Sequence, residues 1–266
     1  MIKTFLTIIA TLVVFRIYFI VIEQKSLYYP MKDIPETPKR LDIPFEDVYF
    51  KTGDGQTLHG WFVPAQGAKI TVLYCHGNGG NIYHRLHRVQ FFHEMGVHFF
   101  IFDYRGYGQS SGRPSEKGLY RDAEAAYDYL LTRKEVDKNK IAVYGESLGG
   151  AVAAELALRR KTSALILEGS FVSVVLRAQQ LYPLLPMKFL ITQKYDTESR
   201  IKKISIPKLI AHARSDEVVG FEHGEMLYKA AAPPKQFLPF DGTHNDDTYV
   251  ISPAYREQLQ RFLTVQ

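Results

Sequence analysis

One short segment of the chain carries the residue types needed for covalent acyl transfer. Gly145, Ser147 and Gly149 follow the pattern G-x-S-x-G, in which a serine stands between two glycines. Where such a pentapeptide joins a strand to a helix, the sharp turn holds the serine hydroxyl clear of the sheet. The segment from Lys140 to Ala157 has this order, because a β-branched and aromatic run precedes the turn and an alanine-rich stretch follows it. We therefore predict that Ser147 is a catalytic nucleophile.

A serine hydroxyl is a poor nucleophile unless a base, oriented by a third group, takes its proton. In the architecture that uses this pentapeptide, the acid and then the histidine follow the serine, each beyond a later strand. Asp216 follows the apolar run at 207–212, and His244 follows the apolar run at 235–240. We therefore predict a catalytic triad of Ser147, Asp216 and His244.

Other aspartates lie closer to the histidine in the sequence, namely Asp241, Asp246 and Asp247. A carboxylate so near His244 would need an unusually tight turn to reach its Nδ1 atom. Asp216 ends a different strand, so the fold can bring it alongside the imidazole. For Asp246 and Asp247 we expect a simpler role, in which negative charge near the start of a helix offsets the helix dipole.

Acyl transfer also needs N–H donors for the oxyanion of the tetrahedral intermediate. One donor is the backbone N–H of the residue after the nucleophile, Leu148, and the other comes from the loop after the third strand. The segment CHGNGGN, residues 75–81, fits that loop, and its glycines leave backbone N–H groups open. We assign the second donor to Asn78, with Gly79 as the alternative. The loop lacks the pattern of a phosphate-binding P-loop.

The loop that begins DYRGYG, at Asp103, carries two charged residues beside the expected site. Asp103 and Arg105 could clamp a substrate. We favour a structural role, in which the two form a charged pair that fixes the loop.

Short apolar runs alternate with longer stretches of helical pattern over most of the chain. Strands are expected at 45–51, 57–63, 70–75, 97–102, 141–145, 164–169, 207–212 and 235–240, and helices at 82–95, 117–133, 148–160, 221–231 and 253–263. This alternation predicts an α/β fold with a mostly parallel twisted sheet and helices on both faces. The first two strands flank the turn TGDGQ and predict an antiparallel hairpin. Ligands bind such sheets beyond the carboxyl ends of the strands.

An apolar segment broken by Pro183 and Pro186 lies between the sixth and seventh expected strands. We predict a short helical cap over about 171–206. Its leucine, methionine and phenylalanine content suits the wall of an acyl-chain pocket. Packing of a plain helix on the sheet is the alternative.

Residues 4–22 form an apolar run whose length matches a bilayer. As a helix, its roughly 19 residues rise about 28 Å, close to the thickness of the hydrocarbon core. Arg16 opposes insertion by about 2.5–3.5 kcal/mol at mid-helix, which the apolar residues outweigh. A cleaved signal peptide is the alternative, but the small residues of a cleavage site are missing. We predict an uncleaved, single-pass membrane anchor at 1–23.

The prolines and charges of residues 24–43 predict an extended tether, which leaves 44–266 as the α/β domain. More basic residues follow the apolar run than precede it. This favours a cytoplasmic position for the domain without fixing the orientation.

Composition argues against several other classes of protein. The formal net charge of +5 over 266 residues is too diffuse to indicate a nucleic-acid partner. Cys75 is the only cysteine, so an intramolecular disulfide or a cysteine metal cluster is excluded. His84 and His87 form H-x-x-H without a third ligand, and we expect neither a metal nor another cofactor.

Four segments together resemble the bud-emergence (Bem)-like branch of the α/β-hydrolase superfamily: HGNGGNIYHR, DYRGYGQSSGRPSEKGLYRDAEAAYDYL, YGESLGGAVAAELA and DGTHND. The resemblance covers roughly residues 25 to 265. It implies the α/β-hydrolase fold and a membrane-associated serine hydrolase that acts on esters or thioesters, with lipid or protein-acyl substrates. Ala213 replaces a glycine that is common in the acid loop of the family. The cysteine-rich start of the depalmitoylase relatives is absent.

These observations predict a membrane-anchored serine hydrolase that cleaves carboxylic esters or thioesters of small or lipid acyl compounds. A serine peptidase is the alternative enzyme, because the same triad can cleave amides. A catalytically silent hydrolase fold that only binds a partner is the alternative outside enzymes.

Overall fold

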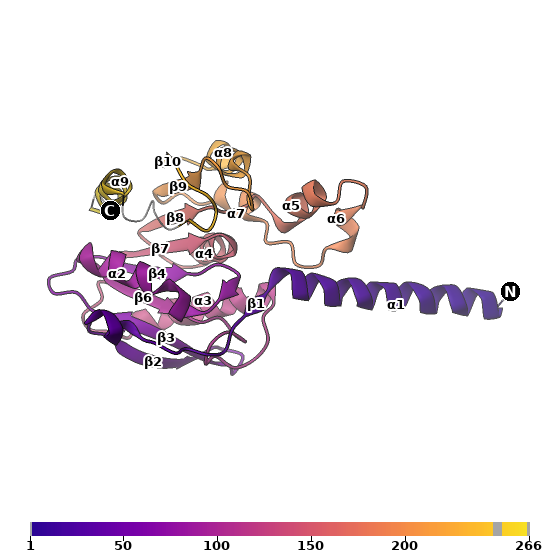
Figure 1. Cartoon of the computed structure of the whole chain (residues 1–266), viewed down its shortest axis with the longest axis horizontal. Coiled ribbons are helices and arrows are strands. Elements are labelled where there is room, and N and C mark those ends of the chain that lie inside the picture. Colours follow the sequence, from indigo (N-terminus) through magenta and orange to yellow (C-terminus); the bar gives the residue numbers. More distant parts are fainter. Residues whose placement is uncertain (1, 247–251, 265–266) are drawn as a thin grey trace.

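An eight-stranded sheet runs through the middle of the part of the chain that the structure, a computed structural model, describes (Figure 1). The described residues are 2–246 and 252–264. The strands lie in the order β10-β9-β8-β7-β4-β6-β3-β2. Their bounds are β2 Glu46–Lys51, β3 Thr57–Val63, β4 Thr71–Cys75, β6 His98–Phe102, β7 Ile141–Glu146, β8 Ala164–Glu168, β9 Lys208–Ala213 and β10 Lys235–Phe240.

Strands β2 and β3 form the expected antiparallel hairpin, and β3 also pairs antiparallel with β6. All other neighbours in this sheet pair in parallel. The mostly parallel sheet predicted from the sequence is therefore confirmed. Because β4, β7, β8, β9 and β10 point the same way, the loops after them meet at one edge of the sheet.

Helices cover both faces of the sheet. On one face lie α3 (Glu116–Leu130), α4 (Leu148–Arg159) and α8 (Phe221–Ala230), and on the other lie α2 (Leu86–Glu94) and α9 (Pro253–Thr264). Successive side chains of a strand point to opposite faces, so each strand supplies both cores. Phe100 and Phe99 of β6, for example, pack in the first and the second core respectively. Fully apolar strands are what a sheet buried on both faces requires.

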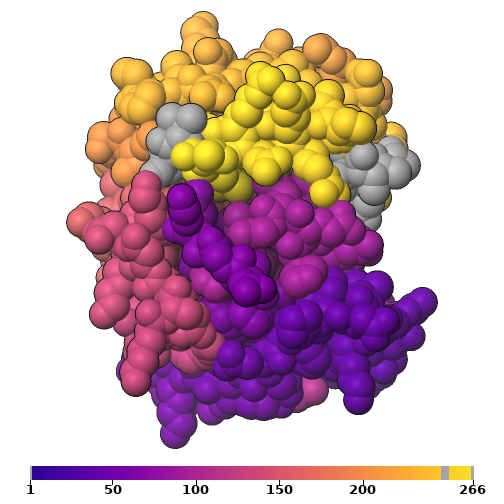
Figure 2. Space-filling view, turned by 90° about the vertical axis from the view of Figure 1, so that its left-hand side faces the viewer, coloured from indigo at the N-terminus to yellow at the C-terminus, as the bar shows by residue number. Residues whose placement is uncertain are grey.

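The C-terminal helix α9 closes the second face. Figure 2 views the end of the molecule away from the N-terminal helix, where the yellow C-terminal segment lies directly against purple segments from the first half of the chain. Arg256 of α9 donates to Glu94 of α2 at 2.7 Å, and the buried Tyr255 hydroxyl donates to Glu168 at the end of β8 at 2.7 Å. These contacts tie α9 to α2 and to the end of β8.

The segment after β8 forms the expected short cap. Its helices are α5 (Val174–Leu181), α6 (Met187–Leu190) and α7 (Thr197–Ile201). The Ser173 hydroxyl caps α5 by accepting a hydrogen bond from the N–H of Leu176 at 3.1 Å. Pro183 and Pro186 lie between α5 and α6 and separate them, since proline cannot continue a helix.

The N-terminal helix α1 (Ile2–Leu27) extends away from the sheet domain, beneath α5 and α6 in the view of Figure 1. It is long and apolar enough to cross a membrane, and its most apolar 18-residue window has a mean hydropathy of 2.5 with no residue buried. The helix continues past the expected end of the anchor at residue 23, through the first part of the segment expected to be extended. The reason is a set of contacts around Glu23, described below.

The rest of the expected tether packs on the domain. Residues Tyr29–Pro30 (β1) pair in parallel with Gly79–Gly80 (β5), and Pro38–Leu41 form a 3-10 helix, η1. A second 3-10 helix, η2 (Ile82–Arg85), precedes α2. The chain after α1 therefore runs directly past the glycine-rich loop at residues 75–81.

Candidate active site

Ser147 stands at the turn between β7 and α4, as the sequence predicts. Its φ is 52° and its ψ is −115°, a left-handed conformation that residues other than glycine rarely adopt. Two hydrogen bonds hold it there: the N–H of Ser147 donates to Glu168 O at 2.8 Å, and the Ser170 hydroxyl donates to Ser147 O at 2.7 Å. The neighbouring strand β8 and the residues after it therefore fix the backbone of Ser147.

The glycines of the pentapeptide are required by close backbone approach. A Cβ atom on Gly149 would lie 2.0 Å from the carbonyl oxygen of Cys75, in the neighbouring strand β4. A Cβ on Gly145 would lie 2.4 Å from the carbonyl oxygen of Gly149. Both distances are far below van der Waals contact, so larger residues would push α4 away from the strand ends.

The three predicted catalytic residues lie in one chain of hydrogen bonds. Ser147 Oγ is 3.0 Å from His244 Nε2, and His244 Nδ1 is 2.7 Å from Asp216 Oδ2. A carboxylate can only accept, so Nδ1 of His244 carries the proton that it donates to Asp216. Nε2 is then the acceptor for the serine hydroxyl. This is the protonation pattern in which a histidine acts as the base for a serine.

The Asp216 carboxylate is held by the loop that follows β9. Its Oδ1 atom accepts hydrogen bonds from the N–H groups of Val218 at 3.0 Å and Val219 at 2.6 Å. His212 Nε2 lies 3.3 Å from Oδ2 and 2.7 Å from the carbonyl oxygen of Val219. Burial alone would raise the pKa of Asp216, but hydrogen bonds from His212, His244 and Val219 outweigh burial and hold the pKa well below its usual range. Asp216 is therefore a carboxylate at neutral pH.

The contact between His212 and Asp216 was missed by sequence reasoning, which treated His212 only as the last residue of a strand. Its four-residue spacing from Asp216 was the available signal. His212 is fully buried, and its Nε2 atom must carry a proton because both nearby oxygens are acceptors. His212 thus connects Asp216 and Val219, the two ends of the acid loop.

The pKa of His244 is shifted upward. Burial opposes protonation of the imidazole, but the hydrogen bond and the negative charge of Asp216 outweigh burial. The backbone N–H of His244 donates to Glu217 Oε2 at 3.1 Å, which ties the histidine loop to the acid loop. The imidazole is therefore fixed through both its ring and its backbone.

The other aspartates near the histidine occupy different places. The side chain of Asp241 is 99% exposed, with Oδ1 3.6 Å from Arg214 Nε. Asp246 lies two residues beyond His244, outside any helix. Asp247 lies outside the described residues, so its expected role near a helix start remains a prediction.

The two expected oxyanion donors border the same cavity as Ser147 and His244. Leu148 is the first residue of α4, so its N–H has no acceptor within that helix. The Asn78 carbonyl accepts hydrogen bonds from the N–H of Tyr29 at 3.1 Å and the hydroxyl of Tyr107 at 2.8 Å. Its side-chain amide donates to Leu27 O at 3.1 Å. The end of α1 thus holds the expected oxyanion loop, residues 75–81, in place.

An ion pair that the sequence did not indicate joins this loop to the nucleophile turn. Arg85 contacts both carboxylate oxygens of Glu146, with Nη2 at 2.8 Å from Oε1 and Nε at 3.2 Å from Oε2. Arg85 Nη1 also donates to the carbonyl of Gly79 at 2.8 Å. Burial would raise the pKa of Glu146, but the charge of Arg85 outweighs burial and holds the pKa below its usual range. The only sequence signal was a charged residue beside the nucleophile.

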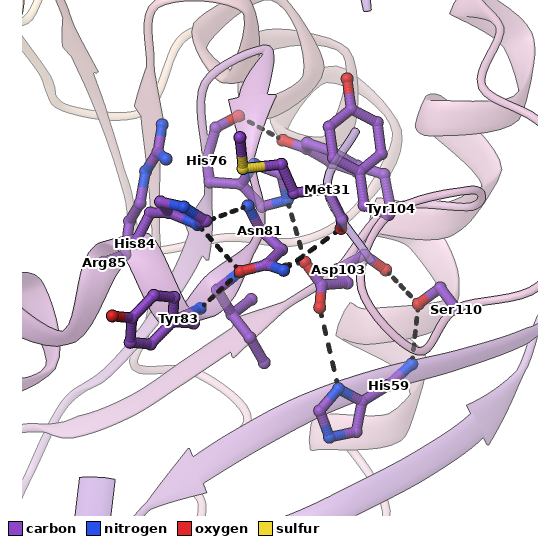
Figure 3. Close-up of polar contacts among 12 residues, drawn as sticks. Met31, His59, His76, Asn81, Tyr83, His84, Arg85, Asp103, Tyr104 and Ser110 are labelled. Carbon is purple, nitrogen blue, oxygen red and sulfur yellow. Dashed lines mark hydrogen bonds and ion pairs between the residues drawn. The ribbon is translucent and has the colours of Figure 1, made fainter. Parts of the chain in front are cut away.

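Asp103 supports the expected oxyanion loop through a hydrogen bond from the residue that follows the loop, and it does not pair with Arg105. Figure 3 shows the Asp103 carboxylate between the loop and His59, with Oδ1 accepting the N–H of Ile82 at 3.0 Å and Oδ2 3.7 Å from His59 Nδ1. Arg105 instead binds two other carboxylates, Asp54 and Asp122. The expected charged pair is wrong, because both residues lie in the turn after β6, where Asp103 faces Ile82 and His59 while Arg105 faces Asp54 and Asp122.

His76, which begins the glycine-rich loop, is a fully buried neutral residue. Burial lowers its pKa to about 3. Its Nδ1 atom lies 2.7 Å from the carbonyl of Gly77, and its ring packs against Tyr104 with centroids 4.3 Å apart. Figure 3 shows His76 among these polar contacts, and His76 is not one of the residues that line the cavity. It shapes the loop and is not placed to act as the base.

A cavity of about 990 Å³ lies above Ser147. Its volume is at the upper end of the range for small-molecule sites. Its wall includes apolar side chains of α1 and of the cap: Phe19, Ile22, Leu27, Val174, Leu181, Leu185, Met187 and Ile191. Within residues 2–246 and 252–264, no group of three or more His, Cys, Asp or Glu side chains is placed to hold a metal ion.

The family model described as "Serine aminopeptidase, S33" matches residues 66–194. The α/β hydrolase domain-containing protein WAV2 of Arabidopsis thaliana is 36% identical over 254 residues, which cover 86% of this chain and 82% of that protein. Protein bem46 of Schizosaccharomyces pombe is 34% identical over 259 residues, which cover 90% of this chain and 85% of that protein.

A solved structure of the Pyrococcus furiosus esterase Pf2001 has the same fold. It matches with a TM-score of 0.75 and 21% sequence identity, and the match covers 90% of this chain and 97% of that one. At this level of identity the likeness concerns the arrangement of strands and helices alone.

Proposed function

Since this chain belongs to the Bem-like branch of the α/β-hydrolases, we propose that it is a serine hydrolase that cleaves carboxylic esters or thioesters through an acyl-enzyme intermediate. Ser147 is the nucleophile, His244 the general base and acid, and Asp216 the group that orients the imidazole. The backbone N–H groups of Leu148 and Asn78 receive the oxyanion. The substrate is a small or lipid acyl compound, and no cofactor takes part.

The reaction proceeds in two displacements. Ser147 Oγ attacks the carbonyl carbon while His244 Nε2 takes the hydroxyl proton, and Asp216 stabilises the imidazolium that forms. Collapse of the tetrahedral intermediate breaks the bond to the alcohol or thiol, which leaves with the proton from His244. Water then attacks the acyl-serine and gives a proton to His244, which returns it to Ser147 Oγ as the acyl C–O bond breaks and the carboxylic acid leaves.

The observation that carries this proposal is the hydrogen-bond chain from Asp216 through His244 to Ser147, which ends at the floor of an apolar cavity. Inside such a cavity, N–H donors are worth more to a developing oxyanion than in water. The apolar wall suits an acyl chain, whereas the hydroxyl and the donors suit its carbonyl group.

The description of the matching family model favours a second candidate, an aminopeptidase. Such an enzyme needs an anionic group for the α-ammonium of its substrate. The carboxylates among the cavity-lining residues are Glu23 and Glu146. Glu23 accepts hydrogen bonds from the cap backbone, and Glu146 is paired with Arg85. Because both carboxylates already have partners within the protein, we favour acyl ester or thioester substrates.

Helix α1 is proposed to anchor the enzyme in a membrane. Its apolar side chains are exposed along most of its length, which is compatible with a lipid environment. A signal sequence passes the same test of length and composition. Edman sequencing of protein from a membrane fraction washed with carbonate separates the two, since an anchor keeps its N-terminus and stays in the pellet.

Labelling with a fluorophosphonate, followed by mass spectrometry, tests the catalytic proposal directly. We expect a single adduct on the peptide that contains Ser147, and turnover of p-nitrophenyl esters or acyl-thioesters that exceeds turnover of aminoacyl-p-nitroanilides. Unlabelled, inactive protein would favour the silent binding fold. Faster cleavage of the anilides would favour the aminopeptidase.

A further inference from the structure

We propose that α1 is a wall of the active site as well as an anchor, and that the substrate is a long-chain acyl ester or thioester of the membrane that reaches Ser147 between α1 and the cap. This inference rests on the proposed hydrolase function and membrane anchoring. It adds a substrate class and a path that neither the triad nor the fold specifies.

One face of the C-terminal part of α1 lines the cavity. The lining residues on α1 are Phe19, Ile22, Glu23, Ser26 and Leu27. They are spaced i, i+3, i+4, i+7 and i+8, which is one continuous stripe of a helix. The cap supplies the facing wall, again as a helical stripe on α5: Val174, Arg177, Ala178 and Leu181. The cavity is therefore a groove between two helices, with Ser147 at its floor.

Polar contacts join α1 to the cap at two positions along the helix. The buried Glu23, 6% exposed, accepts hydrogen bonds from the N–H groups of Thr192 and Gln193, both at 2.8 Å. Arg16 Nη1 donates to the carbonyl of Leu190 at 2.5 Å, at the end of α6. Arg16 lies about 10 Å from Glu23 along the helix, at 1.5 Å per residue. The cap therefore follows α1 well into its apolar part.

This arrangement also accounts for a charged residue in the middle of a membrane helix. An arginine at mid-helix costs about 2.5–3.5 kcal/mol on insertion scales. The last carbonyls of a helix lack intrahelical partners, and those of α6 meet the guanidinium of Arg16. The carbonyls of Phe189 and Leu190 thus give Arg16 acceptors at its own depth along α1.

The part of the cap at that depth is apolar and exposed. We define the cap tip as residues 181–190, in which Lys188 is the only charged residue. Leu184 is 96% exposed and Phe189 is 78% exposed. Apolar surface of this kind is unfavourable in water, whereas interfacial segments bury their apolar side chains about 5–10 Å into a bilayer. The cap tip is thus suited to dip into the membrane beside α1.

The direction of the groove matches the direction of a lipid. α1 leaves the domain at Leu27, where the Asn78 amide donates to its carbonyl, and extends from there away from the domain to the N-terminus. A membrane acyl chain has its carbonyl group near the surface and its tail in the core. Placed along α1, such a chain has its carbonyl near the oxyanion loop and Ser147, and its tail passes Ile22 and Phe19 between α1 and the cap tip.

A bulky side chain in the groove tests the path. Ile22→Trp obstructs the groove, and Val21→Trp places the same indole on the opposite side of α1, where no residue lines the cavity. Both proteins are compared with the unmodified full chain on 4-methylumbelliferyl palmitate in phosphatidylcholine vesicles and on soluble 4-methylumbelliferyl acetate. We expect Ile22→Trp to lower the ratio of palmitate to acetate turnover at least tenfold, and Val21→Trp to leave this ratio within about twofold.

Equal palmitate-to-acetate ratios in the two variants would overturn the inference. Fluorophosphonate labelling of Ser147 in the same samples separates this failure from failure of the proposed function. Labelled protein with an unchanged ratio overturns the groove alone, whereas loss of labelling and of all turnover in the unmodified chain overturns the hydrolase itself.

The position of the cap tip has a test of its own. The chain contains one tryptophan, Trp61, which is fully buried. Leu184→Trp adds a probe to the cap tip, and Tyr49→Trp adds one to β2, at the far edge of the sheet. In vesicles of brominated phosphatidylcholine, we expect quenching of the Leu184→Trp protein well beyond that of Tyr49→Trp. Equal quenching in the two would place the cap tip in water and overturn the inference.

Discussion

His244 Nδ1 lies 2.7 Å from Asp216 Oδ2, although the two residues are 28 positions apart and Asp241 is much nearer in sequence. Strand pairing accounts for this contact. Strands β9 and β10 are parallel neighbours, and Ala213 pairs with Phe240 at the end of both strands. The acid loop and the histidine loop therefore leave the sheet side by side. Asp241 points instead into solvent, toward Arg214.

Replacement of the nucleophile should abolish turnover and keep the fold. Ser147→Ala should lower kcat for p-nitrophenyl esters by about 10⁴ or more, since oxyanion and binding contributions leave only a small residual rate. Circular dichroism should be unchanged. Activity close to that of the unmodified chain would rule out Ser147 as the nucleophile.

The acid position can be tested with a matched pair of aspartates. Asp216→Asn should lower kcat by roughly 10³–10⁴, because the amide favours the wrong imidazole tautomer. Asp241→Asn changes the same group on the solvent side, and Asp246→Asn changes it two residues past the histidine. Each of these should lower kcat less than tenfold. A collapse of kcat in either control, with normal turnover in Asp216→Asn, would move the acid to another residue.

The pH profile should report the raised pKa of His244. Burial lowers this pKa, but the hydrogen bond and charge of Asp216 outweigh burial and raise it above the usual value of about 6.5. His244 must be neutral to accept the serine proton, so kcat/KM falls as pH drops through the raised pKa. The acid limb should therefore lie above about pH 6.5.

Removing the Asp216 charge supplies the control for this limb. In Asp216→Asn, the residual kcat/KM should have its acid limb at lower pH than in the unmodified chain. An acid limb at the same pH in both proteins would mean that the titrating group is not His244 under the influence of Asp216.

The Arg85–Glu146 pair should matter for both stability and catalysis. Arg85→Leu leaves the Glu146 carboxylate, whose side chain is 21% exposed, without its arginine partner, which costs about 1–3 kcal/mol in the free energy of unfolding. The oxyanion loop also loses its tie to the nucleophile turn, so we expect kcat to fall more than KM rises. Urea unfolding and ester kinetics measure the two effects.

Arg121 provides the control for this pair. It is an exposed arginine that also contacts a carboxylate, that of Asp54, at 2.9 Å. Arg121→Leu should cost less than about 1 kcal/mol. If Arg85→Leu does not fold, the double variant Arg85→Met/Glu146→Gln removes both charges and should recover stability but not full kcat. Full kcat in a folded double variant would contradict a positioning role.

Much of the sheet and of the site could be predicted from the sequence. Period-two and fully apolar runs mark strands well, and each predicted strand lies within a residue or two of the observed one. The triad candidates followed from strand order, because residues just past parallel strands share one edge. Predicting the triad in this way requires the number and direction of the strands, but not which strands pair with one another.

Contacts between distant side chains could not be predicted in the same way. Arg85 and Glu146 come from a helix start and a strand end that no periodicity relates. The contact of Glu23 with the cap joins segments 169 positions apart. Because the sequence showed residues 24–43 only as proline-rich and charged, it indicated a tether. The structure instead continues α1 to Leu27 and pairs Tyr29–Pro30 with Gly79–Gly80 of the glycine-rich loop.

The backbone of Ser147 has a consequence for the stability of the fold. A non-glycine residue at φ 52° and ψ −115° costs about 1–3 kcal/mol. Ser147→Gly removes this strain and loses about 0.5–1 kcal/mol to the greater freedom of the unfolded chain. The glycine variant should therefore melt at a higher temperature than Ser147→Ala, which keeps the strain, although both are inactive. At this one residue, the chain gives up stability to hold a hydroxyl clear of the sheet.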